Sequence, residues 1–480
     1  MVAAHWDLRE WVQEFEKLGE LRYAEGVDPN LELGAICDVS THKFGSPAIL
    51  FRNIKGYEGR GRILANFYGS SKRAGLVLGI TPDESKTRMV EEWRKKIRNL
   101  SLVPPKTVAT APVKENVFQG TEVDLFKLPI PLWHELDGGR YLGTGCVVIT
   151  RDPDDGWINL GTYRGMVHDK TSMALHLSPG RHGRIHRDKY FEKKKPFPVA
   201  VVFGCDLDLL TFSQISMVPY GVSEYDYAGG LRGSPIEVIP GEVTGLPIPA
   251  SAEVAIEGEC IPGDTVPEGP FGEWSGYYGG GARAEPVVRI KTLMFRNDPI
   301  MTGWSPVRPP SNNNYLRAII RSGSMWDTLE KGGLSEIKGI WCHEAGACWL
   351  FNVISIKQRY AGHAKQAALQ MSQCEEGASM GRFIIVVDED IDPSNLEEVI
   401  WAICTRCDPE TAIDILRRCR GSFLDPVFNK KGAVPFNGLN SRAIIEATKP
   451  FEWINDFPQS VKISPETRNE LEKKWGNLFK

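Results

Sequence analysis

The chain has 480 residues, of which 42% are hydrophobic and 25% charged, with a formal net charge of −4 and a pI near 6.2. This length predicts two or three domains with well-formed cores, and the composition is typical of a soluble globular protein. A slightly acidic chain gives no electrostatic reason to expect nucleic acid or an anionic membrane surface as a partner. No apolar run is long enough to cross a bilayer, and the N-terminus lacks the pattern of a signal peptide, so we expect a cytoplasmic protein.

The ten cysteines are too dilute along the chain for a disulfide scaffold and fit a reducing compartment. Cys404 and Cys407 form a CxxC pair within a helical pattern, without a second CxxC. We interpret this pair as structural thiols rather than as a zinc or redox site.

The first 105 residues predict an α/β segment. Asp7 as N-cap and Glu10 three residues later indicate the start of a helix that Gly19 ends. Pro104 and Pro105 then interrupt the pattern, so we place a domain boundary near residue 105. The expected strands are Leu21–Tyr23, Ala48–Phe51 and Arg62–Ala65, and the expected further helices are Lys72–Leu78 and Pro82–Asn99.

Residues 106–310 change to short β-rich runs separated by glycine and proline, a spacing that indicates a barrel or sandwich. The expected strands are Cys146–Thr150, Trp157–Tyr163, Met173–Leu177, Val199–Phe203, Glu253–Glu257 and Val287–Phe295.

After residue 311 helix and strand signals alternate again and predict a third, α/β segment. Arg382–Val387 reads as a mostly apolar strand, and Ser394 with Glu397 reads as a capping box that opens the next helix. Pro465–Trp475 is expected to be a short, charged amphipathic helix, either a docking or swapping element or a solvated chain end.

The segment Val266–Tyr278, VPEGPFGEWSGYY, carries two glutamates, Glu268 and Glu273, among glycine and proline. We expect a rigid loop, because glycine permits close approach to a ligand and Pro270 removes backbone freedom. The segment also holds aromatic residues that make a poor exposed loop but a good wall for a desolvated pocket: Phe271, Trp274, Tyr277 and Tyr278. This composition favours a pair of acids that transfers protons over a solvated surface turn.

Four polar residues of the middle segment fit no purely structural pattern: Asn159, Arg164, His182 and Glu224. An amide oxygen, an imidazole nitrogen and a carboxylate suit Mn²⁺ or Mg²⁺ better than tetrahedral zinc. A competing zinc site would use His182 and His186, spaced i,i+4. That pair lacks the glutamate of the HExxH motif and lies among arginines, so we rank it lower.

These motifs resemble those of the UbiD family of decarboxylases, which use prenylated FMN, over nearly the full length of the chain. The matching stretches are PIPLW (Pro129–Trp133), DGG (Asp137–Gly139), NLGTYR (Asn159–Arg164), the His of SPGRH, GVSEYDY (Gly221–Tyr227), PASAE (Pro249–Glu253), PEGPFGE (Pro267–Glu273) with Gly276 and Tyr277, and VVDEDIDP (Val386–Pro393). They occur in the family's order and close to its spacing.

The resemblance implies an α/β (α+β) protein with three parts. These are an N-terminal α/β domain (1–105), a split β-barrel domain that binds prenylated FMN (106–310), and a C-terminal α/β oligomerisation domain with a terminal helix (311–480). It also implies a homodimer or homohexamer, and a flavin prenyltransferase as the partner that supplies the cofactor.

The resemblance further implies that Asn159, His182 and Glu224 hold a divalent metal, usually Mn²⁺, that bridges to the flavin phosphate, with K⁺ nearby on backbone oxygens. Arg382 stands where family members usually have Lys, and an arginine can still pair with phosphate. The residues implied to line the cofactor are Asn159, Leu160, Gly161, Thr162, Tyr163, Arg164, Arg181, His182, Glu224 and Arg382.

Arg164, Glu268 and Glu273 match the family's catalytic Glu-Arg-Glu network, with Arg164 orienting the substrate carboxylate and Glu273 donating the proton that replaces CO₂. By analogy the far wall of the pocket comes from Trp304–Pro310 and Leu424–Leu439. Aromatic side chains there favour a flat aromatic or heteroaromatic acid, and polar ones could read its substituents: Trp304, Phe428 and Phe436, then Arg308, Asn437 and Asn440.

Three other functions stay open on the sequence alone. The first is an FMN oxidoreductase, although no nicotinamide-binding glycine motif follows a strand. The second is a metal-dependent hydrolase in which Glu268 and Glu273 act as acid and base. The third is a non-catalytic scaffold subunit, which would tolerate loss of both acids.

Overall fold

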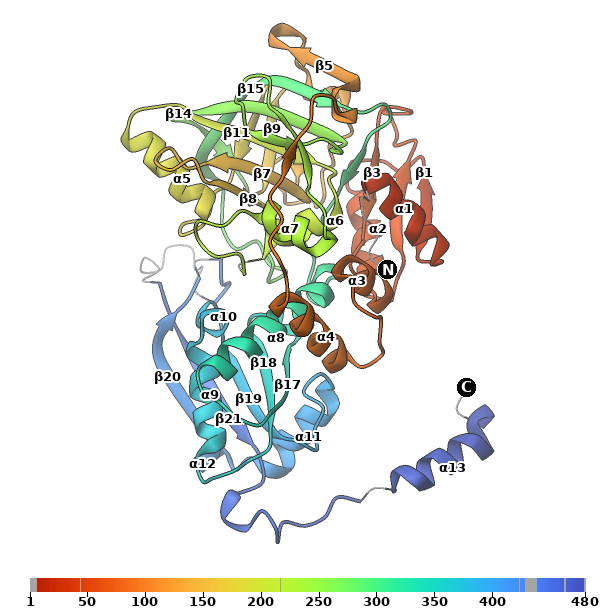
Figure 1. Ribbon diagram of the computed structural model, residues 1–480, viewed down its shortest axis with the longest axis vertical. Helices are drawn as coiled ribbons and strands as arrows, with labels where there is room; N and C mark the ends of the chain where they lie inside the picture. Colours follow the sequence, from red (N-terminus) through yellow and green to blue (C-terminus); the bar gives the residue numbers. More distant parts are fainter. Residues whose placement is uncertain are drawn as a thin grey trace.

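The computed structural model describes residues 7–478 except residues 44, 216, 423, 428–437 and 462. The chain is a mixed α/β protein in which a curled, half-barrel sheet lies beside an N-terminal α/β unit, with a C-terminal α/β unit below both (Figure 1). Within the described residues no helix has the length and apolar character needed to span a membrane.

The N-terminal unit is a four-stranded sheet with four helices. Asp7 accepts a hydrogen bond from the backbone of Glu10, whose side chain accepts one in return; this capping box confirms the predicted N-cap at Asp7. The fourth strand of this sheet, β16, comes from residues 300–302, so the chain returns to the N-terminal unit long after residue 105. In spatial order the strands are β1 (Leu21–Glu25), β2 (Ala48–Arg52), β3 (Arg62–Ala65) and β16 (Ile300–Thr302), and the helices are α1 (Leu8–Lys17), α2 (Glu32–Thr41), α3 (Ser71–Leu78) and α4 (Lys86–Arg98).

The central sheet has nine strands and is mostly antiparallel, as the short β runs predicted. Its path is β6 (Arg140–Gly143), β9 (Gly165–Asp169), β10 (Ser172–Leu175), β15 (Arg283–Phe295), β14 (Val254–Glu268), β11 (Phe197–Phe203), β7 (Cys146–Arg151) and β8 (Ile158–Gly161), with β5 (Asn116–Gln119) also paired to β15. Helices α5 (His182–Glu192), α6 (Leu207–Gln214) and α7 (Glu224–Arg232) accompany it, as does a small sheet of β13 (Pro247–Pro249), β12 (Glu237–Pro240) and β4 (Lys106–Thr107).

The segment Val266–Tyr278 differs in part from the expected loop. Strand β14 extends far beyond the predicted Glu253–Glu257 and ends at Glu268, which pairs with Arg283 of β15. Glu268 is therefore fixed by a strand, and only the residues after it form the turn that carries Glu273. The expected aromatic wall is also incomplete, because Phe271 is buried but the side chain of Tyr277 is 63% exposed.

The C-terminal unit is a five-stranded sheet in the order β17 (Ile337–Cys342), β18 (Phe351–Ile356), β19 (Phe383–Asp388), β21 (Leu439–Ala447) and β20 (Ile413–Arg420). The predicted capping box at Ser394 is wrong, because Asn395 is the N-cap of α11 and accepts from the backbone of Glu397 and Glu398. The helices are α8 (Asn312–Lys331), α9 (His363–Gln373), α10 (Glu375–Ala378), α11 (Leu396–Arg406), α12 (Pro409–Ala412) and α13 (Pro465–Trp475).

Helix α13 stands away from the rest of the molecule at the end of an extended segment (Figure 1). Cys404 lies near the end of α11 and is exposed, while Cys407 caps the same helix. Six short 3₁₀ helices complete the described chain: η1 (Pro112–Glu115), η2 (Gly120–Glu122), η3 (Leu125–Lys127), η4 (Glu344–Gly346), η5 (Phe451–Trp453) and η6 (Gly476–Leu478).

Candidate active site

Arg164 joins the two glutamates that the sequence singled out. Its Nε and Nη2 donate to the two carboxylate oxygens of Glu268 at 2.7 and 2.9 Å, and its Nη1 donates to Glu273 at 2.5 Å. Arg164 lies between β8 and β9, over a hundred residues from either acid in sequence. All three side chains are largely shielded from solvent, so the central sheet gathers an acid–arginine–acid trio in a low-dielectric site.

Packing fixes the turn that carries Glu273. A Cβ on Gly138 would lie 2.0 Å from the carbonyl oxygen of Gly269, so the DGG segment and the turn touch at backbone distance. The ring of Phe271 packs on Tyr141 with centroids 4.0 Å apart, and the guanidinium of Arg164 lies 5.5 Å from the Phe271 centroid. The packing of Phe271 against Tyr141 and Arg164 therefore fixes one side of the acid–arginine–acid trio.

The two acids have unequal environments. Burial by itself would raise the pKa of Glu268, but the hydrogen bonds and charge of Arg164, with smaller contributions from His176 and Tyr141, outweigh it and lower that pKa. Tyr141 donates to Glu268 at 2.9 Å, which gives Glu268 three side-chain donors. Glu273 accepts one side-chain hydrogen bond, from Arg164. Glu268 is thus the firmly held anion of the pair.

The segments that carry the three predicted metal ligands meet near Tyr163. The Glu224 carboxylate, at the first residue of α7, accepts from the backbone N–H of Leu160 at 2.7 Å, next to Asn159 on β8. The Tyr163 hydroxyl accepts from the backbone N–H of Gly183, the residue after His182, at 3.0 Å, and Tyr163 follows Asn159 by four residues on the same segment. The strand, α7 and the start of α5 therefore meet at one place.

The charge of this cluster fits a cation. Burial raises the pKa of Glu224 to about 8, and no lysine, arginine or histidine pairs with it in the described part of the chain. Burial and the neighbouring Arg181 lower the pKa of His182, which favours the neutral imidazole that binds metals. A divalent cation would supply the positive counter-charge for the Glu224 carboxylate.

The remaining predicted cofactor residues divide into two groups. Leu160, Gly161 and Thr162 continue from Asn159 to Arg164 along β8 and the turn after it, and Arg181 directly precedes His182. Arg382, in contrast, precedes β19 of the C-terminal unit and forms an ion pair with Asp425. Its contact with a cofactor phosphate stays a prediction.

The competing zinc pair lies on α5, where the ring of Trp157 packs 5.0 Å from both His182 and His186. His186 is buried, and its Nδ1 is engaged by Thr150 at 3.0 Å. The structure therefore favours a structural role for His186.

The proposed far wall of the pocket is described only in part. The ring of Trp304 lies 5.4 Å from the guanidinium of Arg317, and Arg308 is exposed. Asn440 is buried in β21 and donates to the carbonyl of Gly381 at 3.3 Å. Three predicted wall residues lie outside the described residues: Phe428, Phe436 and Asn437.

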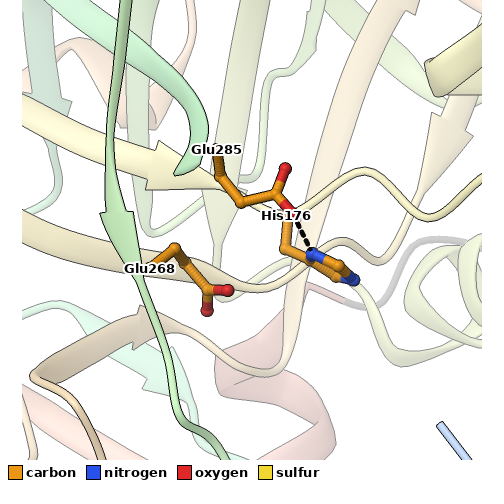
Figure 2. A group of neighbouring side chains, drawn as sticks. All are labelled: His176, Glu268 and Glu285. Carbon is orange, nitrogen blue, oxygen red and sulfur yellow. Dashed lines mark hydrogen bonds and ion pairs between the residues drawn. The ribbon is translucent and has the colours of Figure 1, made fainter. Parts of the chain in front are cut away.

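Three residues of the site are not predicted from the sequence. Tyr141 binds Glu268, and His176 with Glu285 lies beside it (Figure 2). Nitrogen and oxygen atoms of His176, Glu268 and Glu285 lie within 4.8 Å of one another, a spacing at which a metal ion could be held. The available signal was a histidine in an otherwise apolar strand, Met173–Leu177, which alone is more often a satisfied core residue.

Comparisons with known proteins cover the whole chain. Models of the 3-octaprenyl-4-hydroxybenzoate carboxy-lyase family match in three parts: its N-terminal domain at residues 12–93, its Rift-related domain at 106–309 and its C-terminal domain at 314–447. Phenolic acid decarboxylase of Bacillus subtilis (strain 168) is 32% identical over 484 residues, covering 99% of each chain.

Solved structures agree in fold. Vanillic acid decarboxylase of Sedimentibacter hydroxybenzoicus, in an open form, has a TM-score of 0.85 and 30% identity, over 99% of this chain and 100% of that chain. An evolved dimeric form of the UbiD-class enzyme HmfF from Pelotomaculum thermopropionicum, in complex with prFMN, has a TM-score of 0.82 and 28% identity, over 98% and 99%. With family models matched along its length and a full-length relative at 32% identity, the chain belongs to the UbiD family and is a carboxy-lyase of the UbiD type.

Proposed function

We propose that this enzyme is a reversible, non-oxidative decarboxylase of an aromatic, heteroaromatic or α,β-unsaturated carboxylic acid, with prenylated FMN as its cofactor. The observation that carries the proposal is Arg164, which binds two buried glutamates at once. A guanidinium between two acids can hold one as an anion and leave the other to exchange a proton. Neither redox chemistry on plain FMN nor a scaffold role needs this arrangement.

The cofactor supplies the electron sink that amino-acid side chains lack, because loss of CO₂ from an sp² carbon leaves an unstabilised carbanion. Asn159, His182 and Glu224 would hold Mn²⁺ at the cofactor phosphate, since their donor set and the unbalanced charge of Glu224 suit a hard divalent cation. Arg382 would reach the same phosphate, and K⁺ would bind nearby.

The protein itself positions the substrate and delivers one proton. Arg164 orients the substrate carboxylate while it stays bonded to Glu268. CO₂ leaves, and Glu273 gives its proton to the carbon that held the carboxylate, so that R–COO⁻ and H⁺ become R–H and CO₂. Solvent then returns a proton to Glu273, whose side chain is 10% exposed. In concentrated bicarbonate the same groups would act in reverse, with Glu273 as the base.

The proposed organisation follows the family. Residues 1–105 form the N-terminal domain, 106–310 a split barrel that binds prenylated FMN, and 311–480 an oligomerisation domain of a homodimer or homohexamer. The names of the relatives, phenolic and vanillic acid decarboxylase, support an aromatic acid as the substrate. A flavin prenyltransferase would supply the cofactor.

The test is to co-express the chain with a flavin prenyltransferase and to measure the mass and absorbance of the flavin that the purified protein releases. Prenylated FMN, with CO₂ release from one or more of a panel of hydroxybenzoic, pyrrole, indole, furan and cinnamic acids, is the expected result. Plain FMN with no CO₂ release would indicate an oxidoreductase, and no flavin would indicate a hydrolase or a scaffold.

A further inference from the structure

His176 and Glu285 form a buried pair beside the trio that the proposed mechanism does not use. His176 Nδ1 lies 2.7 Å from Glu285 Oε1, and both side chains are nearly inaccessible to solvent. The carboxylate of Glu268 faces the same space from the neighbouring strand (Figure 2). Ser178 is hydrogen-bonded to the other ring nitrogen of His176 at 3.2 Å.

Strand pairing explains why these groups meet. Glu268 on β14 is opposite Arg283 on β15, so Glu285, two residues further along β15, lies on the same face of the ribbon. Strand β10 pairs with the other edge of β15 and delivers His176 just beyond its end. The backbone N–H of His176 also donates to the carbonyl of Arg164 at 3.1 Å, so His176 contacts the trio through its backbone as well.

The charges near Glu268 are out of balance without His176. Three buried carboxylates, of Glu268, Glu273 and Glu285, lie close together, and the Arg164 guanidinium pairs with Glu268 and Glu273 whereas Glu285 is hydrogen-bonded to His176. Tyr141 is the other titratable group in contact with Glu268, and it adds no positive charge. A protonated His176 would balance the charge of Glu285, its hydrogen-bond partner, and a proton on Glu273 would leave Arg164 to balance Glu268.

A proton suits this site better than a metal ion. Both oxygens of Glu268 already accept from Arg164, and one also accepts from Tyr141. His176 Nδ1 is directed at Glu285, so a metal ion would also have to displace this contact. The short contact between His176 and Glu285 is typical of a charge-assisted hydrogen bond.

We propose that His176, held by Glu285, is a positioning residue whose imidazolium helps Arg164 to keep Glu268 ionised, so that Glu273 is the acid of the trio that exchanges a proton. The kinetic consequence rests on the proposed decarboxylase function. The charge of His176 does not depend on that function, and it can be measured in the cofactor-free protein.

The first experiment is NMR of ¹⁵N-histidine-labelled, cofactor-free protein near neutral pH, about pH 7, where free imidazole is mostly neutral. His176 is assigned among the nine histidines by its loss in His176→Asn. If that variant does not fold, Ser178→Ala, which changes only the group on Nε2, provides the assignment. The expected result is a doubly protonated ring in the wild type and a singly protonated ring in Glu285→Gln. A singly protonated ring in the wild type would overturn the proposal whatever the enzyme's substrate.

The second experiment is the pH profile of kcat/KM for the cofactor-loaded enzyme and its His176→Asn variant. Asparagine keeps a donor for Glu285 but carries no charge, so Glu268 takes up a proton at higher pH and the acidic limb moves to higher pH. A residue of merely structural importance would lower activity at all pH values without moving the limb, and that result would refute the proposal. Glu192→Gln, an exposed change on α5, is the control. A tightly bound metal ion that disappears in Glu285→Gln would instead make this a metal site and also refute the proposal.

Discussion

Glu273→Gln is the sharpest test of the proposed chemistry, because the structure predicts that it removes the transferable proton and little else. The glutamine Oε1 can still accept from Arg164 Nη1, and Arg164 keeps its two hydrogen bonds to Glu268. No buried charge loses its partner, so we expect the variant to fold like the wild type. Because Asn159, His182 and Glu224 do not contact Glu273, flavin and metal should bind normally.

The expected loss of turnover follows from the role of a general acid. Positioned acids contribute about 10²- to 10⁴-fold to rate, which corresponds to about 3 to 5 kcal/mol of transition-state stabilisation. Glutamine cannot donate a proton to a developing carbanion, and the trio is shielded enough that water replaces the acid poorly. We therefore expect at least a hundredfold decrease in kcat, with KM changed much less.

The assay is CO₂ release at saturating substrate by protein whose flavin content is measured from its absorbance. The matched control is Glu192→Gln, the same chemical change at an exposed residue of α5, which should keep full activity. A Glu273→Gln enzyme that is fully loaded with prenylated FMN and turns over at a near-normal rate would refute the assignment of Glu273 as the proton donor.

Three further outcomes are expected. Arg164→Ala leaves Glu268 buried without its counter-charge and should lower the free energy of unfolding by about 3 to 5 kcal/mol in urea titrations. Because the fold raises the pKa of Glu224 to about 8, ionising this group destabilises the metal-free chain as the pH rises towards 8. Below pH 8, Mn²⁺ binding should therefore release a proton from Glu224, and the Mn²⁺ affinity should increase with pH up to about 8, both measured by calorimetry. Glu224→Gln should abolish the proton release. Gly138→Ala would put a Cβ 2.0 Å from a backbone oxygen and should reduce both stability and CO₂ release, whereas Gly281→Ala, with no neighbour within 4 Å, should not.

The sequence predicted much of the secondary structure because local signals are strong there. The capping box at Asp7 and Glu10 needs only four consecutive residues, and the strand Arg62–Ala65 is observed with the predicted bounds. The error at Ser394 is equally local, since Ser394 and Asn395 are adjacent and both residue types are favoured at the N-cap. The return of residues 300–302 to the N-terminal sheet is a long-range event that no local pattern encodes.

The candidate site also divides into residues with a signal in the local sequence and residues that only long-range packing brings together. Glu268 and Glu273 stood out because glycine, proline and aromatic residues surround them. Asn159, Arg164, His182 and Glu224 stood out because they fit no purely structural pattern, and the family resemblance then implied their roles. His176 and Glu285 carry no such local pattern, and they are 109 residues apart in sequence. Their meeting depends on the register of β10 against β15, which is set by tertiary packing.

The different roles of the two acids follow from how many donors each one meets. Glu268 ends a strand, is fully buried and accepts three side-chain hydrogen bonds, with an imidazole close by. Protonating it would break contacts that suit only the anion, so it serves best as a fixed negative charge that holds Arg164 in place. Glu273 lies on the turn beyond the strand, accepts one such bond and keeps some contact with solvent. That weaker hold fits the role proposed for Glu273, which would give up and regain a proton in every cycle, and the end of β14 between the two acids allows their environments to differ.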